Sequence, residues 1–207
     1  PCYCTRSELH AASAPHASDG RVIYAGTCRS LTPEQRAAQT RAPAWRVRVP
    51  EETVEFCDGV FGMVRQSLAA DCGDFILRRS DGVYAYQLAV VCDDADGGVT
   101  EVVRGCDLLD STPRQIWLDR QLGFRAPQFY HVPLLVAPDG RRLSKRERSL
   151  DLAHLRQTHT PQQVIGWLAH AAGLRPTPRP IAPPELVPDF RWEAIRKENI
   201  PIFAEIS

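Results

Sequence analysis

Three of the seven cysteines stand near the start of the chain, at a spacing that suits a metal ion. Cys2 and Cys4 form a Cys-x-Cys pair, and Cys28 follows after a longer segment. Two thiolates at this spacing can share one ion, and small zinc modules close their loop with a distant cysteine. Residues 1–30 are poor in core-forming side chains, so zinc would supply folding energy that this segment lacks. The pattern predicts a Zn²⁺ site rather than three unrelated thiols.

The fourth ligand of this site stays open on the residues alone. Neutral imidazole is a standard zinc ligand, which favours His10 or His16. Tyr24 is the other candidate, because a bound cation can lower the pKa of a phenol from its usual value of about 10. The remaining cysteines stand in apolar or strand-like contexts and are expected to be small buried residues. They are Cys57, Cys72, Cys92 and Cys106.

A second group of residues suited to chemistry is cationic. Residues 141–148 (RRLSKRER) contain five basic side chains and follow a predicted strand and a Pro-Asp-Gly turn. Lys145 is one of only two lysines in the chain, and its compact ammonium suits a triphosphate. Ser144 can bring a hydroxyl to the same phosphate oxygens. The segment is interpreted as a phosphate-binding loop, with a solvated basic loop or a tRNA-facing surface as the open alternatives.

The elements that must position these residues alternate between strands and helices. Helices are expected over residues 31–42, 111–122 and 160–171. Thr32 can cap the first, and Ser111-Thr112-Pro113 opens the second with a capping residue followed by proline. Strands are expected over residues 46–49, 53–56, 74–79, 99–103 and 129–136, and residues 84–91 suit either a strand or a helix. Asp58-Gly59 marks a turn. A stiff proline-rich linker is expected over residues 176–188 and a last short helix over 189–196. The alternation predicts an α/β layered domain.

Composition sets limits on the class of protein. The 207 residues are 43% hydrophobic and 24% charged, which is typical of a globular protein and excludes a mainly disordered chain. Basic and acidic residues balance at 25 each, so a nucleic acid would have to meet a local basic patch. No run approaches the length of a membrane span and no signal peptide is recognised, so we expect a cytoplasmic protein with reduced thiols and no membrane partner.

Several segments, in this order and spacing, resemble the glutamyl subclass of class I aminoacyl-tRNA synthetases. RLSKR (142–146) looks like the second signature loop of that class. Upstream, the resemblance rests on DFILRRSDG (74–82), YAYQLAVVCDD (84–94), GVTEVVRG (98–105), STPRQ (111–115) and YHVPL (130–134). Together these segments cover residues 74–146 and are far more specific than any one of them.

The N-terminal cysteines resemble the zinc module of the glutamyl-queuosine tRNA(Asp) synthetases, the short paralogues of glutamyl-tRNA synthetase. In that family a tyrosine is the fourth ligand, so the resemblance implies a zinc site made by Cys2, Cys4, Tyr24 and Cys28 in place of either histidine. The 62 residues after Lys145 (207 − 145) are too few for the large anticodon-binding region of a full glutamyl-tRNA synthetase, which favours the paralogue.

The resemblance also implies a reaction. The family uses ATP, with Mg²⁺, to activate L-glutamate to glutamyl-adenylate, and passes the glutamyl group to the queuosine base in the anticodon of tRNA(Asp). Lys145 is the expected catalytic residue, because its ammonium can neutralise the departing pyrophosphate in the transition state. Arg142 and Ser144 are expected to bind ATP together with Lys145. A monomer is expected.

Glutamate binding is assigned by the resemblance to two side chains. Arg104 can hold a carboxylate with its planar guanidinium, and Tyr86 can donate its hydroxyl to the same ligand. On the residues alone, Arg104 paired with Glu101 or Asp107 and Tyr86 as a core tyrosine are the alternatives. His131 is expected to be structural or to lie beside the nucleotide rather than to transfer protons.

The implied fold is the second half of a Rossmann-type class I catalytic domain. We expect a zinc-binding module and connecting insertion over residues 1–73, the catalytic half-domain over 74–150 and a helical C-terminal region over 151–207. Nothing before Cys2 resembles the first class I signature, so the chain is expected to be the later part of a longer protein that completes the adenylate site. The alternatives are a glutamyl-tRNA synthetase fragment that charges the tRNA 3′ end, and a non-catalytic zinc-containing module that binds tRNA.

Overall fold

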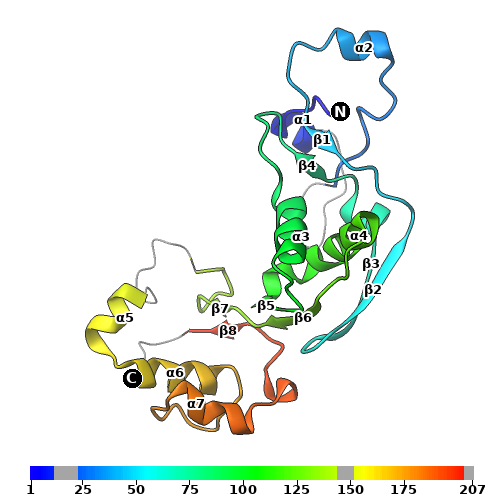
Figure 1. Ribbon diagram of the computed structural model, residues 1–207. Helices are drawn as coiled ribbons and strands as arrows, with labels where there is room; N and C mark the ends of the chain where they lie inside the picture. The colour runs from blue at the N-terminus through cyan, green and yellow to red at the C-terminus, as the bar shows by residue number, and fades with distance from the viewer. Residues whose placement is uncertain (12–22, 144–151, 203–207) are drawn as a thin grey trace. The chain divides into compact units, whose positions relative to one another are not determined.

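A computed structural model describes residues 1–11, 23–143 and 152–202 of the chain (Figure 1). Its contacts divide the chain into two compact units, each built from several stretches of sequence. The first unit comprises Pro1–Phe56, Met63–Thr100 and Asp110–Pro127. The second comprises Cys57–Gly62, Glu101–Leu109 and Gln128–Ser207. The division of the chain at residues 73 and 150 stays a prediction.

The N-terminal part of the first unit is held by short pairings rather than by a large sheet. It contains helices α1 (Arg6–Ala11) and α2 (Pro33–Ala37), and strand β1 (Trp45–Arg46) pairs antiparallel with β4 (Ile76–Arg78). Cys2 forms a two-way backbone bridge with Ala44, with N···O distances of 2.7 and 2.9 Å. The predicted helix after Thr32 is confirmed but short, and the Thr32 hydroxyl caps it by accepting from the Gln35 N–H.

Two helices of 11 residues each pack together in the first unit. Helix α3 (Tyr86–Asp96) settles the ambiguity over residues 84–91 in favour of a helix, and α4 (Thr112–Leu122) confirms the helix expected there; the two lie against each other (Figure 1). Between them, the Gln87 amide donates to the Ser111 hydroxyl at 3.2 Å and accepts from the Gln115 amide at 2.8 Å. Ser111 makes no side-chain capping bond, and a 3-10 helix (Cys106–Ser111) leads directly into α4.

A hairpin of strands β2 (Thr53–Asp58) and β3 (Gly62–Ser67) follows β1, and a π-helical turn (Leu68–Cys72) follows β3. Strand β2 extends the predicted strand, and the turn expected at Asp58 is confirmed, whereas β3 was not predicted. Gly62 adopts a φ of +79° at the start of β3, a conformation that glycine adopts without steric cost. The tip of the hairpin, residues 57–62, belongs to the second unit.

The centre of the second unit is a pair of parallel strands, β5 (Glu101–Gly105) and β6 (Gln128–Val132), in which Arg104 stands opposite His131. Strand β7 (Leu135–Val136) pairs in parallel with β8 (Ile200–Pro201) near the end of the chain. The single strand predicted over residues 129–136 is thus divided into β6 and β7. Pro133 stands at the break, where it cannot donate a ladder hydrogen bond.

The rest of the second unit contains α5 (Leu152–Thr158), α6 (Pro161–Ala171) and α7 (Pro183–Leu186). Helix α6 confirms the amphipathic helix predicted after Thr160, whose hydroxyl accepts from the Gln163 N–H. The segment 176–188 is not a plain linker, because it packs on α6: Ile181 N–H donates to the Gln162 carbonyl at 3.0 Å, and a Cβ on Gly166 would overlap the Arg179 carbonyl.

The last predicted helix is wrong. Over residues 189–196 the chain forms only a 3-10 turn (Trp192–Ala194), preceded by another at Val187–Asp189. Arg191 between them is extended, with φ −141° and ψ 129°, which prevents one continuous helix.

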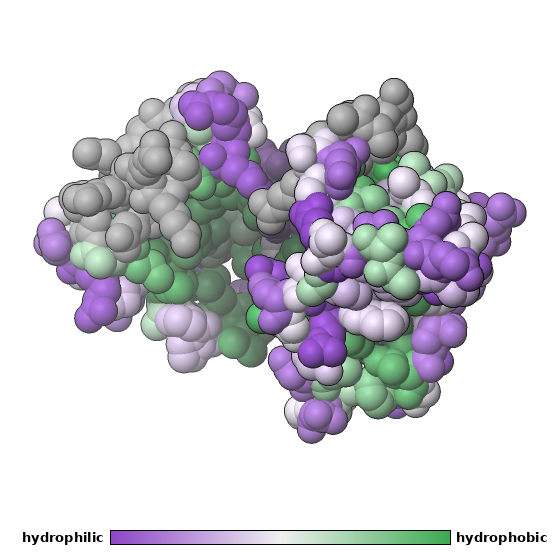
Figure 2. All heavy atoms as spheres, turned by 90° about the horizontal axis from the view of Figure 1, so that it is seen from above, coloured by the Kyte–Doolittle hydropathy of each residue, from purple (hydrophilic) through white to green (hydrophobic). Residues whose placement is uncertain are grey.

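The surface of the described residues mixes hydrophilic and hydrophobic side chains. Figure 2 shows the two kinds interspersed over the face in view. Among the described residues, no helix has both the length and the apolar character that a membrane crossing requires.

Candidate functional site

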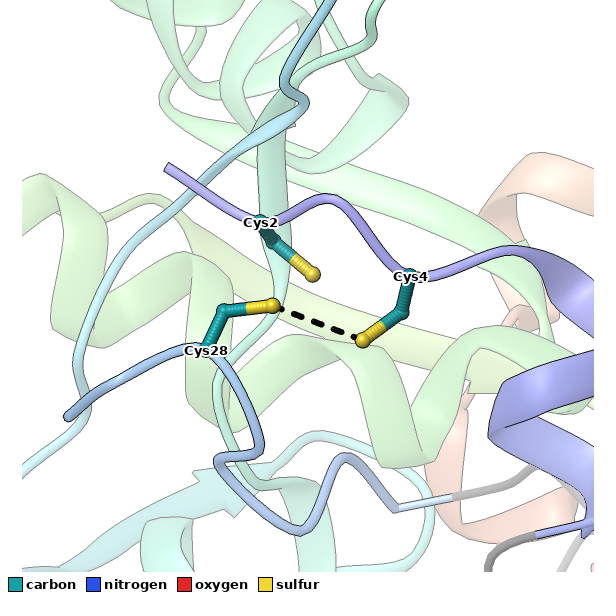
Figure 3. Close-up of side chains that lie close together, drawn as sticks. All are labelled: Cys2, Cys4 and Cys28. Atoms are coloured by element: carbon teal, nitrogen blue, oxygen red, sulfur yellow. Dashed lines mark hydrogen bonds between the residues drawn. The ribbon is translucent and has the colours of Figure 1, made fainter. Parts of the chain in front are cut away.

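The three N-terminal cysteines converge in the first unit (Figure 3). Cys2 and Cys4 come from the extended N-terminal segment and Cys28 from the loop after Tyr24, and their sulfur atoms all lie within 4.8 Å of one another. The Sγ atoms of Cys4 and Cys28 are 3.5 Å apart, too far for a disulfide. Sulfur atoms of a tetrahedral zinc site with Zn–S bonds of about 2.3 Å would stand about 3.8 Å apart. The arrangement is therefore close to that of a thiolate zinc site.

Tyr24 joins this cluster through its hydroxyl. The ring is 7% exposed and packs with Cys2 and Cys28 in one buried group. Its oxygen accepts the Cys28 backbone N–H at 2.7 Å and also contacts the thiols of Cys2 and Cys28. The Arg46 guanidinium carbon lies 4.3 Å from the centroid of the ring. The structure thus brings together the four side chains predicted as ligands.

The surroundings shift the pKa values of Cys4, Tyr24 and Cys2 in different directions. Burial raises the pKa of Cys4 to about 12, and the neighbouring thiols Cys28 and Cys2 act in the same direction. Burial also raises the pKa of Tyr24 against the opposing Cys28 N–H. At Cys2, burial is outweighed by bonds from the Cys4 backbone, Arg46 and Tyr24, so its pKa is lowered. A dication would favour the anionic form of every one of these groups.

The donor set fits zinc. Three soft sulfur atoms and one oxygen make four donors, the number that a closed structural zinc site takes. Arg46 adds a positive charge beside the anions that such a site would contain. His16 lies outside the described residues, as does the side chain of His10.

The other four cysteines do not match the expectation that they are buried. Cys57 is exposed, and Cys72, Cys92 and Cys106 are half-buried. Burial alternates along β2, and Cys57 falls on its exposed face while Asp58 falls on the buried one. The alternation of polar and apolar residues expected over 53–56 continues through these two residues.

Arg104 lies in the second unit on β5. Its Nε–H donates to Nε2 of His131 at 3.0 Å, and its guanidinium carbon lies 5.1 Å from the centroid of the Phe129 ring. Asp107, one of the partners considered for Arg104, forms an ion pair with Arg142. Arg104 is half-buried, so its position combines firm support with access from solvent.

Asp58 contacts His131 behind Arg104, and the sequence analysis did not identify it as a site residue. The His131 Nδ1 and an Asp58 carboxylate oxygen are 2.6 Å apart, and both side chains are fully buried. Burial lowers the pKa of His131, and the charge of Arg104 acts in the same direction against Asp58. In the sequence, Asp58 stands next to a glycine and indicates only a turn. Its position on the buried face of β2, which follows from the strand alternation, is the signal that points to a role inside the protein.

The other predicted site residues are Tyr86, Arg142, Ser144 and Lys145. Tyr86 is the first residue of α3 in the first unit and is 51% exposed, so it is not a core tyrosine. Arg142 lies in the second unit, exposed and bridged to Val136 through its backbone. Ser144 and Lys145 lie outside the described residues.

Comparison with known proteins gives the family. Residues 1–172 match the family model described as tRNA synthetases class I (E and Q), catalytic domain. A relative named glutamyl-Q tRNA(Asp) synthetase in Symbiobacterium thermophilum is 50% identical and covers 99% of this chain and 65% of its own length. One of the same name in Nitratidesulfovibrio vulgaris is 49% identical and covers 90% of this chain and 59% of its own.

The fold comparison agrees with this assignment. The crystal structure of a glutamate-tRNA synthetase from Elizabethkingia anophelis aligns with a TM-score of 0.76 at 22% identity, covering 99% of this chain and 48% of that one. The chain spans from about half to about two thirds of the length of the relatives it matches. The chain belongs to the class I tRNA synthetases of the E and Q group and has the fold of their catalytic domain.

Proposed function

We propose that the whole protein activates glutamate with ATP and Mg²⁺ and transfers it to the queuosine base in the anticodon of tRNA(Asp). The observation that carries this proposal is the 50% identity, over 99% of this chain, to a relative named glutamyl-Q tRNA(Asp) synthetase. The first step makes glutamyl-adenylate and releases pyrophosphate. The second step transfers the glutamyl group from the adenylate to the tRNA base and releases AMP.

Two side chains are proposed to bind glutamate. Arg104 offers a planar guanidinium, which matches the geometry of a carboxylate better than an ammonium does. Its support by His131 and Phe129 favours binding in one fixed orientation. Tyr86, half exposed at the start of α3, can donate its hydroxyl to the ligand. Both roles also rest on the match of YAYQLAVVCDD and GVTEVVRG to the family.

Charge stabilisation in the adenylate step is assigned to the basic segment 142–145. Attack on the α-phosphate increases negative charge on the departing pyrophosphate, and an ammonium that meets this charge in the transition state lowers the barrier. Lys145 is proposed for this role, with Arg142 and Ser144 positioning the phosphates.

Zinc is proposed to have a structural role. Cys2, Cys4, Tyr24 and Cys28 would hold it, and the energy of binding would stabilise the small buried group to which these side chains belong. Four protein donors leave no open coordination position for a substrate, so no step of the reaction is assigned to the metal.

The test of the function supplies the whole protein with ATP, labelled glutamate and three purified tRNAs. These are tRNA(Asp) with queuosine, tRNA(Asp) without it, and tRNA(Glu). The proposal predicts label only on the queuosine-bearing tRNA. Labelling of tRNA(Glu) at its 3′ end would instead indicate a glutamyl-tRNA synthetase. An absence of glutamate-dependent exchange between pyrophosphate and ATP would indicate a module that binds tRNA without catalysis.

A further inference from the structure

A buried carboxylate stands behind the histidine that contacts Arg104. Asp58 ends β2, and one of its oxygens lies 2.6 Å from His131 Nδ1. Its other oxygen accepts the backbone N–H groups of Val60 and Phe61, both at 2.9 Å, and that of His131 at 3.3 Å. The hairpin turn and strand β6 therefore fix the carboxylate in one orientation.

The hydrogen-bond pattern determines which imidazole nitrogen carries the proton. A guanidinium has only donors, so the bond from Arg104 Nε to His131 Nε2 requires Nε2 to be the acceptor. Nδ1 must then carry the proton and donate it to Asp58. His131 is neutral in this arrangement, with the carboxylate on one side and the guanidinium on the other.

The strand register and an aromatic ring hold the guanidinium in the same place. Arg104 and His131 are direct partners on parallel strands, so their side chains start from adjacent positions on the same face. The Phe129 and His131 rings stack with their centroids 6.3 Å apart and an interplanar angle of 17°. Because Nε contacts His131, a ligand carboxylate would have to be met through the terminal amino groups of Arg104.

We propose that Asp58 and His131 are positioning residues for glutamate: they orient the Arg104 guanidinium through a fixed imidazole tautomer. This inference rests on the proposed binding of glutamate by Arg104. Neither residue touches the substrate. Their effect is to hold the donors of Arg104 in a binding orientation before glutamate arrives, which removes an ordering cost from binding.

The substitution Asp58→Asn tests the tautomer directly. Asparagine can keep its oxygen towards the three backbone N–H groups only by turning its NH₂ towards His131 Nδ1. Nδ1 must then become an acceptor, and the proton moves to Nε2, where it faces the Arg104 N–H. Two donors cannot bond each other, so the bond between Arg104 and His131 is lost. His131→Asn can keep a donor towards Asp58 but is too short to place an acceptor at the position of Nε2, so it breaks the connection on the Arg104 side.

The experiment measures the apparent KM for glutamate and for ATP by pyrophosphate exchange in the whole protein. Because both variants remove a bond to the charged Arg104, D58N and H131N are each expected to raise the KM for glutamate about tenfold to hundredfold. The KM for ATP is expected to stay within about twofold. Asn199→Ala is the matched control in the same unit, since it removes bonds to Leu134 and Cys106 without touching Arg104. It should lower the thermal midpoint without raising the KM for glutamate.

A double-mutant cycle separates positioning from general stability. Arg104→Lys keeps the charge but removes the Nε–H, so D58N should add little to the KM change in that background. Additive effects in an active parent would overturn the inference alone. A parent without glutamate-dependent exchange would overturn the proposed function and the inference with it.

Nitrogen NMR of histidine-labelled parent protein gives a readout that does not depend on activity. The signals of His131, assigned by their loss in H131N, should show the proton on Nδ1. A proton on Nε2 in the parent would overturn the inference.

Discussion

Arg29 and Asp74 form a two-point ion pair that connects the cysteine cluster to strand β4. Arg29 follows Cys28 directly, and its Nε and Nη2 atoms donate to the two carboxylate oxygens at 2.7 and 2.6 Å. Asp74 stands two residues before β4 and is 4% exposed. It also accepts the Val49 backbone N–H at 3.0 Å. One carboxylate thus joins three segments of the first unit.

Asp74→Asn is expected to destabilise the protein at neutral pH by about 1–3 kcal/mol, the usual cost of losing bonds to a charged group. The cost stays in this range because Arg29 is partly exposed and solvent screens its charge. Burial raises the pKa of Asp74, but Arg29, Val49 and Arg48 outweigh it and lower the pKa overall. A lowered folded pKa contributes stability above the unfolded value of about 4, and this contribution is lost as the pH falls through the folded pKa.

The difference between parent and D74N in urea unfolding should therefore shrink on acidification. Glu55→Gln is the matched control, because Glu55 pairs with Arg65 at 2.5 Å on the surface and both side chains are exposed. Its effect should stay below about 1 kcal/mol. Equal losses in the two variants would contradict the role given to Asp74.

The sequence predicts best where local signals agree. Helices α4 and α6 are marked by a proline in the first turn and by a glycine after the last turn, which act within a few residues. The cysteine cluster is also local, apart from Cys28. The type of α3 is less certain from sequence, since an apolar run of that length suits a strand as well.

Long-range contacts account for what the sequence could not predict. The bond of Asp58 to His131 joins residues 73 positions apart, and it exists because the hairpin tip meets β6. No sequence motif that contains one of these two residues also contains the other. The proline-rich segment 176–188 is predicted to be a linker, because the sequence of the segment does not show that it packs on α6 at Gly166.

Zinc content tests the cluster. We expect about one zinc ion per chain in the parent and a loss of bound zinc in Cys28→Ser, because one of four donors is removed. Cys57→Ser is the matched control, since Cys57 is exposed and stands outside the cluster. Metal analysis after dialysis against a chelator gives the measurement. A zinc content in C28S equal to that of the parent would contradict the assignment of Cys28 as a zinc ligand.

Tyr24→Phe tests the fourth ligand separately. It removes only the oxygen that accepts the Cys28 N–H at 2.7 Å, and the buried ring remains. We expect weaker zinc retention than in the parent under the same chelator series. If retention is unchanged, a different fourth donor must be sought, and His10→Ala and His16→Ala are the variants to compare.

Tyr86→Phe tests the second contact to glutamate. Loss of one hydroxyl donor is expected to raise the KM for glutamate by about threefold to tenfold, with little change in the KM for ATP. Tyr84→Phe is the control, because Tyr84 is two residues away and is likewise exposed, at 62% against 51%. Equal KM values for glutamate in Y86F and Y84F would remove Tyr86 from the binding site.

Lys145→Ala tests charge stabilisation in the adenylate step. Loss of a charge that acts mainly in the transition state should lower kcat about 100-fold or more and leave the KM for glutamate nearly unchanged. Lys197→Ala is the control, because Lys197 is the other lysine of the chain and belongs to no predicted site. Pyrophosphate exchange under saturating ATP gives kcat. Equal turnover in K145A and the parent would refute the assignment.

Asp119→Asn is expected to stabilise the protein at neutral pH. Asp119 is 3% exposed near the C-terminal end of α4, and burial, with the charge of Asp94, raises its pKa to about 6. A carboxyl group whose folded pKa exceeds its unfolded value of about 4 binds the proton more tightly in the folded state, so stability falls as the pH rises from about 4 to about 6. Asparagine carries no charge and avoids this loss.

The gain in D119N at pH 7 should be on the order of 1–2 kcal/mol and should disappear near pH 4, where the parent carboxyl is protonated in both states. Asp96→Asn serves as the control, because Asp96 is exposed at the end of α3 and its removal should change stability by less than about 0.5 kcal/mol. Urea unfolding of all three proteins across this pH range gives the comparison. A gain that is independent of pH would mean that the carboxyl of Asp119 is not the group that loses stability on ionisation.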